Sequence, residues 1–184
     1  MLFRSLYAFD LDKAQALLKQ AGVSGFEMEA IYVGTSSTDI ALAQIYQSDL
    51  ARIGVKLNFR PLDAAARSAA TNNGQFSGVS IYSGSFSQVE PSTFFVISNA
   101  WAPAKNAASF KNDQYTNLVD AATTEPDAGK RKQLYSMLND FILDQSFLMM
   151  IARYYTTTLA QTRVHGVKYM LGGGITPADV WLSP

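Results

Sequence analysis

The chain has 184 residues, of which 48% are hydrophobic and 16% are charged, and fifteen basic residues balance fifteen acidic ones. This composition is typical of a globular domain, and zero net charge offers no general attraction for nucleic acid. The lack of cysteine excludes disulfides, thiolate nucleophiles and cysteine-bound metals. No apolar run approaches the roughly 20 residues of a spanning helix, and residues 1–10 become polar too soon for a signal peptide.

The first half of the chain alternates helix patterns with strand patterns. Apolar residues at helical spacing predict helices over 12–21 and 39–52, and a short helix over 64–70. Alternating apolar and polar residues predict strands over 27–33, 55–60 and 77–82. We expect these strands to form one sheet, in which Leu57 and Phe59 lie in the same sheet as Ile31 and Val33. The order indicates an α/β fold, a lobe built on a mixed sheet.

The second half begins with helix patterns over 92–100, 113–123 and 127–144. The last two are separated by Glu125 and Pro126, because proline interrupts a helix. Residues 147–151 and 155–159 are strand candidates. The glycines at 172–174 predict a flexible break before the tail that carries Trp181.

Four segments along the chain resemble sequence motifs of one protein family. Residues 9–22 match a Y-D-P-x-K-A-K-x-L-L-x-x-A-G helix, and residues 40–55 resemble I-A-Q-x-I-Q-x-D-L-A-K-I-G-I. Residues 90–95 resemble D-P-x-x-F-F, and residues 112–135 resemble N-x-x-Y-D-x-L-L-D-x-A followed by D-x-x-K-R-x-x-L-Y. Together they resemble the extracellular solute-binding proteins of family 5, the peptide/nickel-type receptors of ABC importers.

The resemblance implies a fold and a function. The fold would be a lobe of a two-lobed protein like the type II periplasmic binding proteins, with residues 1–184 as a single C-terminal lobe. Residues from about 165 to 184 would form a tail that belongs with the missing lobe. Such a receptor closes on a small solute between its lobes and delivers it to permease subunits in the membrane. We therefore expect a periplasmic or extracellular location, membrane association through the transporter, no enzymatic activity and no cofactor.

The resemblance also places a ligand-binding segment after the third predicted strand. The candidate residues offer aromatic rings for stacking and small polar groups for hydrogen bonds: Tyr32, Tyr82, Ser83, Gly84, Ser85, Phe86, Ser87 and Glu90. Peptide binders of the family commonly carry Asp where Ser87 stands and Trp where Gly84 stands. A neutral serine cannot form the charge-assisted bond that an α-ammonium group prefers. The resemblance therefore favours solute binding more than selection of peptides.

Other interpretations stay open. The aromatic candidates Tyr32, Tyr82 and Phe86 can equally belong to the core. A free-standing α/β enzyme domain would need an activated nucleophile, and the sequence has no Gly-x-Ser-x-Gly motif. A dimerisation module is another alternative, because an isolated lobe exposes apolar surface and can self-associate. The only histidine, His165, has no cysteine or second histidine to complete a zinc site, so we expect no metal site. We also expect no catalytic residue.

Overall fold

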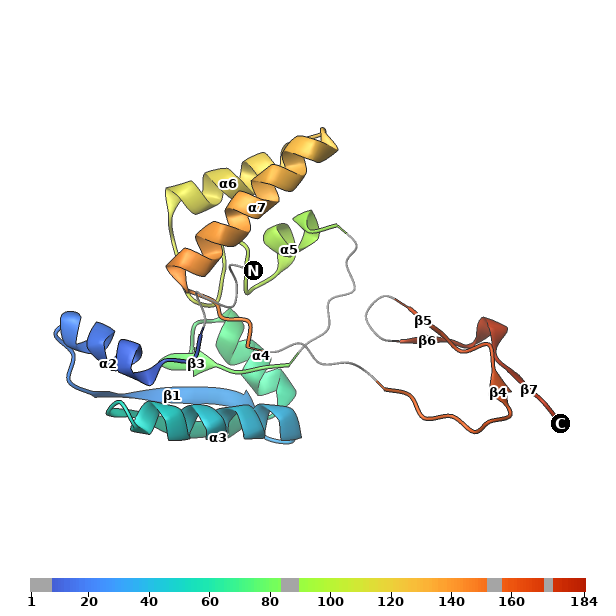
Figure 1. The fold of residues 1–184 in the computed structure, drawn as a ribbon, viewed down its shortest axis with the longest axis horizontal. Helices are drawn as coiled ribbons and strands as arrows, with labels where there is room; N and C mark the ends of the chain where they lie inside the picture. The colour runs from blue at the N-terminus through green and yellow to red at the C-terminus, as the bar shows by residue number, and fades with distance from the viewer. Residues whose placement is uncertain (1–7, 84–89, 152–156, 171–173) are drawn as a thin grey trace. The chain divides into compact units, whose positions relative to one another are not determined.

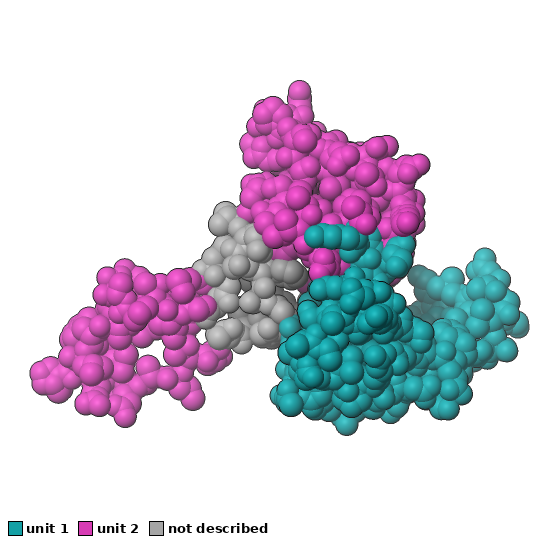
Figure 2. All heavy atoms as spheres, turned by 180° about the vertical axis from the view of Figure 1, so that it is seen from behind, with its two compact units in different colours: residues 1–83, 105–109 teal, residues 84–104, 110–184 magenta. Residues whose placement is uncertain are grey.

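The computed structural model describes residues 8–83, 90–151, 157–170 and 174–184 (Figure 1). The chain divides into two compact units (Figure 2). Unit 1 comprises residues 1–83 and 105–109, and unit 2 comprises residues 84–104 and 110–184. Each unit has its own hydrophobic core. That residues 1–184 act as one lobe of a larger protein stays a prediction.

Unit 1 is a three-stranded sheet with helices between its strands. Its elements are α2 (Leu11–Gln20), β1 (Phe26–Val33), α3 (Ser37–Ala51), β2 (Val55–Leu62), α4 (Ala64–Asn72) and β3 (Gly78–Ser80). The strand order is β2-β1-β3. Leu57 pairs with Met28 and Phe59 pairs with Ala30, in the sheet that also contains Ile31 and Val33. The predicted α/β fold and the predicted membership of the sheet are confirmed.

All pairings in this sheet are parallel among the described residues, whereas the sequence predicted a mixed sheet. Each connection between its strands contains a helix, and such a crossover returns the chain to the end of the sheet where it started. The described antiparallel pairs lie in unit 2 instead. Both faces of the central strand are covered, since the neighbours Ala30 and Ile31 are each fully buried.

Packing in unit 1 centres on α3, which runs along β1 (Figure 1). Ala30, Tyr32 and Leu57 on the strands meet Ala43 on α3 in the hydrophobic core. β3 is shorter than the predicted 77–82. Its Gly78 has φ of 142°, and a Cβ added there would lie 2.3 Å from the backbone oxygen of Glu29. This close approach of two backbones requires glycine.

Unit 2 contains α5 (Ser92–Ile97), α6 (Asp113–Thr124), α7 (Ala128–Gln145), η1 (Pro177–Asp179) and four two-residue strands: β4 (Val164–His165), β5 (Lys168–Tyr169), β6 (Ile175–Thr176) and β7 (Trp181–Leu182). The predicted break between α6 and α7 is confirmed. Asn112 caps α6 and Asp127 caps α7, each through a side chain that accepts a backbone N–H three residues on. The core of the unit is built from Tyr115, Val119, Leu138 and Ile142.

Three predictions for unit 2 are wrong in part. Residues 147–151 form no strand, because Phe147 stacks on Phe110 with ring centroids 4.3 Å apart and no described segment pairs with this run. Of the candidate strand 155–159, residues 157–159 are described and are not a strand. The helix predicted over 92–100 ends at Ile97, where Ser98 turns extended. Within the described ranges, no helix is long and apolar enough to cross a membrane.

Candidate functional site

Several polar groups lie at the carboxyl edge of the unit 1 sheet. The backbone N–H of Ile81 donates to the carbonyl oxygen of Ile31 at 2.9 Å, so the chain still follows β1 just beyond β3. Tyr82 and Ser83 therefore emerge at the end of the sheet where β1 leads into α3. Carboxyl ends of parallel strands and helix N-termini meet at this edge, which is where open α/β sheets commonly bind ligands.

The carboxylate of Asp39 holds Ser83 in place. Asp39 lies in the first turn of α3, where its backbone N–H donates to the capping Ser36 Oγ at 3.2 Å. Its side chain is buried, with 1% exposure. Oδ1 accepts hydrogen bonds from the backbone N–H of Ser83 at 3.1 Å and from Ser83 Oγ at 3.0 Å. The helix N-terminus and the two donors together stabilise the buried negative charge.

Arg67 of α4 holds the same segment from another side. Its Nε and Nη2 donate to Ser80 Oγ at 3.3 and 3.1 Å. Its guanidinium carbon lies 4.2 Å from the centroid of the Tyr82 ring, a cation–π contact. Burial lowers the pKa of Arg67, while Tyr82 and Asp39 act in the opposite direction. We call Asp39, Arg67, Ser80, Tyr82 and Ser83 the sheet-edge cluster.

The structure brings together two of the residues predicted from sequence, Tyr82 and Ser83. Tyr82 keeps 39% of its surface exposed and can be reached by a solute. Tyr32 is only 6% exposed, and its ring meets Phe59 edge to face at 5.7 Å, so it packs in the core of unit 1. Glu90 belongs to unit 2, where its Oε1 lies 3.7 Å from Arg131 Nε.

Four further candidates lie outside the described residues: Gly84, Ser85, Phe86 and Ser87. Their assignment to a binding segment stays a prediction. Sequence analysis missed three members of the sheet-edge cluster, Asp39, Arg67 and Ser80. A signal for Arg67 was present, because it is the only charged side chain in the alanine-rich helix Ala64–Asn72. Asp39 had a weaker signal, an acidic residue in the first turn of a helix that follows a strand.

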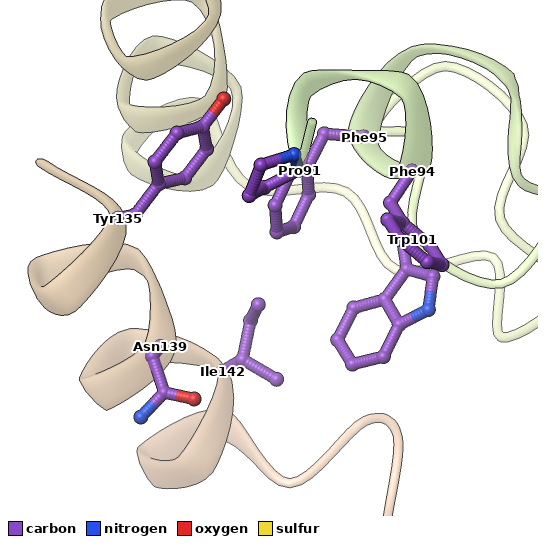
Figure 3. A pocket seen from close by; sticks show the side chains of 7 residues that line it. All are labelled: Pro91, Phe94, Phe95, Trp101, Tyr135, Asn139 and Ile142. Atoms are coloured by element: carbon purple, nitrogen blue, oxygen red, sulfur yellow. The ribbon is translucent and has the colours of Figure 1, made fainter. Parts of the chain in front are cut away.

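Unit 2 has an apolar pocket of about 310 Å³ (Figure 3). One wall is the α7 face of Tyr135, Asn139 and Ile142, and the opposite wall comes from the segment around α5: Pro91, Phe94, Phe95 and Trp101. Phe95 stacks on Tyr135 with centroids 6.0 Å apart and meets Trp101 edge to face at 6.0 Å. The pocket offers apolar contact, and among the described residues no three His, Asp or Glu side chains gather as metal ligands.

A family model decides the membership of the chain. Residues 3–120, more than half of the 184 residues, match the model described as bacterial extracellular solute-binding proteins, family 5, middle part. The chain belongs to this family. The resemblance inferred from four sequence segments is thereby confirmed.

Relatives in this family are named as binding proteins. The glutathione-binding protein GsiB of Salmonella typhimurium is 30% identical over 149 residues, which cover 76% of this chain and 29% of GsiB. The dipeptide binding protein of Pseudoalteromonas sp. SM9913, solved in complex with Met-Leu, is 25% identical with a TM-score of 0.75, over 95% of this chain and 36% of that one. The chain thus spans about a third of the length of these relatives.

The fold is also shared with a solved structure of lower sequence identity. The periplasmic binding protein DppA of Helicobacter pylori has a TM-score of 0.77 at 24% identity, covering 96% of this chain and 35% of DppA. The expected likeness to type II periplasmic binding proteins is confirmed by these structures.

Proposed function

We propose that this chain supplies part of the solute-binding face of an ABC importer receptor. The observation that carries the proposal is the family match over residues 3–120. The receptor would take up a small solute in a cleft between two lobes and pass it to the permease subunits in the membrane. It would work outside the cytoplasmic membrane, associated with it through the transporter, without chemical turnover and without a cofactor.

The sheet-edge cluster is the proposed place of contact. Tyr82 offers an exposed ring on which a solute can stack, and the Asp39 and Arg67 contacts hold this segment in one position before a solute arrives. A pre-organised site spends less binding energy on ordering its own groups. Residues 84–87 and Glu90, the other candidates from the sequence, stay separate predictions of solute contact.

The solute is proposed to be peptide-like. GsiB is named for glutathione and the Pseudoalteromonas protein was solved with Met-Leu. The test uses the complete gene product and titrates glutathione and Met-Leu by calorimetry and thermal shift. We expect saturable binding of at least one of them and a raised melting temperature, since a ligand stabilises the state that binds it.

A matched pair of variants connects binding to the site. Tyr82→Ala should weaken the binding of that ligand about tenfold, because an aromatic contact and its apolar area are lost. The control Tyr169→Ala removes a ring that is 55% exposed on β5, and it should leave affinity unchanged. Hydrolysis or modification of a bound probe, or failure of a wider panel of peptides, opines and sugars to bind, would argue for the enzyme alternative.

The amino end of the solute provides a second test. Because Ser87 stands where peptide binders of the family carry Asp, this receptor should not select free peptide N-termini through that position. Met-Leu and N-acetyl-Met-Leu should bind alike, and Ser87→Asp should favour the free amine. A strong preference for the free amine in the unmodified protein, abolished by Glu90→Gln, would show that Glu90 replaces the missing Asp.

A further inference from the structure

The turn after α4 contains the only Asn-Gly pair of the sequence, Asn73 and Gly74. Both residues are exposed. In such a pair the backbone nitrogen of the glycine can attack the side-chain carbonyl carbon of the asparagine, because glycine has no Cβ to hinder the approach. The surroundings of Gly74 leave that approach open, since a Cβ built on it would meet no atom within 4 Å.

Both reacting groups are weakly held. In the part of the chain that the structure describes, the side-chain amide of Asn73 has no hydrogen-bond partner. The N–H of Gly74 donates to the carbonyl oxygen of Thr71 at 3.5 Å, which is beyond the usual length of such a bond. Asn73 has ψ of 3°, so the attack needs a rotation that also opens the bond from Gln75 N–H to the Ala70 oxygen, 2.8 Å long. Exposed helix ends open locally at low cost in free energy.

We infer that Asn73 is a modification site, which deamidates without an enzyme to aspartate and isoaspartate. The Gly74 nitrogen forms a bond to Cγ of Asn73, the bond from Cγ to Nδ2 breaks, and ammonia leaves with the proton that the Gly74 nitrogen gives up. Solvent water then opens the resulting succinimide ring. Addition of water at Cγ gives aspartate. Addition at the main-chain carbonyl carbon gives isoaspartate, in which the side-chain carbons of residue 73 become part of the backbone.

The isoaspartate form loosens the connection between α4 and β3. It inserts an extra carbon atom into the backbone between Thr71 and Ser80, whose hydroxyl oxygens lie 3.2 Å apart. The bond from Gln75 to Ala70 spans the modified residue and cannot keep its geometry. The new carboxylate also lies at the C-terminal end of α4, where the helix dipole disfavours negative charge. Because Ser80 belongs to the sheet-edge cluster, the modification reaches that cluster through β3.

The test follows each asparagine while the folded chain is kept at mildly alkaline pH. Mass spectrometry of digests locates every converted amide, and isoaspartyl methyltransferase labelling measures isoaspartate. Asn117 and Asn139 are controls within the same chain, because both are exposed but lie inside α6 and α7, where the next N–H belongs to the helix. We expect Asn73 to convert at least about tenfold faster than either, as a barrier lower by about 1.4 kcal/mol gives. Equal rates at the three sites, or conversion of Asn73 only in urea-unfolded protein, would overturn the inference.

Hydrogen exchange tests the structural effect without any solute, so its outcome does not depend on the proposed function. The isoaspartate form is separated from unmodified protein by ion exchange and compared with Asn73→Asp, which has the same charge on an ordinary backbone. The amide of Gln75 should lose its protection in the isoaspartate form and keep it in Asn73→Asp. Asn73→Gln, whose longer side chain closes a larger ring more slowly, should stay unchanged over the same incubation. Equal protection of Gln75 in the isoaspartate form and in Asn73→Asp would refute the loosening of the connection.

Discussion

The buried carboxylate of Asp39 is the group whose removal tests the sheet-edge cluster most directly. Asp39→Ala deletes the acceptor of two hydrogen bonds from Ser83, at 3.1 and 3.0 Å. It also removes a negative charge from the first turn of α3. Asp39→Asn removes the charge but keeps an oxygen that can still accept from Ser83.

The expected cost follows from these contacts. Hydrogen bonds to a charged group are worth about 1.5–3 kcal/mol each, but Ser83 is exposed and water can replace part of what is lost. The helix N-terminus adds about 0.3–1 kcal/mol. We therefore expect Asp39→Ala to lower the free energy of unfolding of unit 1 by about 3 kcal/mol and Asp39→Asn by about 1–2 kcal/mol.

The assay is urea unfolding, with hydrogen exchange of unit 1 amides as the readout. Tryptophan fluorescence would not serve, because Trp101 and Trp181 both lie in unit 2 and report on that unit. The amide of Ser83 should lose its protection in Asp39→Ala. The control is Asp49→Ala on the same helix, whose carboxylate is partly exposed and lies 3.7 Å from Arg52; such surface pairs contribute about 0–1 kcal/mol. An equal loss of unfolding free energy in Asp39→Ala and Asp49→Ala would refute the view that Asp39 holds Ser83 in place.

Three further predictions concern packing, backbone and pH. Leu138→Ala in the core of unit 2 should cost about 2–5 kcal/mol in urea unfolding, and Met137→Ala, at a neighbouring position that is 55% exposed, well under that. Gly78→Ala should abolish the pairing of β3 with β1, seen as lost amide protection, whereas Gly74→Ala, with φ of 64° and open space around it, should cost only about 1–2 kcal/mol; equal effects would contradict the close backbone approach. Burial raises the pKa of Tyr115 above its ordinary value of 10, so the unfolded chain loses this proton first and stability should fall as pH rises above about 10. Tyr115→Phe should flatten that alkaline decline while losing the hydrogen bond that the Tyr115 hydroxyl donates to the carbonyl oxygen of Trp101. An unchanged slope would assign the decline to other groups.

Local sequence signals predicted most of the helices. The helix predicted over 39–52 is α3, Ser37–Ala51, and the one over 127–144 is α7, Ala128–Gln145. Their caps and stops are formed by neighbouring residues, so the sequence near each end contains the information. β1 and β2 were predicted for a similar reason, because apolar and polar residues alternate along much of each strand.

The errors come from contacts between distant parts of the chain. The apolar run 147–151 resembled a strand, yet the ring of Phe147 finds its partner in Phe110, far away in sequence. The direction of the sheet strands depends on how the connecting helices pack, which no single segment reveals. Residues of the candidate site were missed for the same reason. Asp39 and Arg67 are separated by a helix and a strand, and only the fold places both beside residues 80–83.

The five residues 105–109 belong to unit 1, although they follow a stretch that belongs to unit 2. They include Asn106, which is 94% buried since only 6% of its surface is exposed. A ribosome releases the chain from its N-terminus, and compact units form as wholes once their residues are available. Residues 105–109 therefore join unit 1 only after residues 84–104 have been made, although the last strand of the unit is complete by residue 80. A chain that ends at residue 83 lacks the five late residues of unit 1, and a chain that ends at residue 109 includes them.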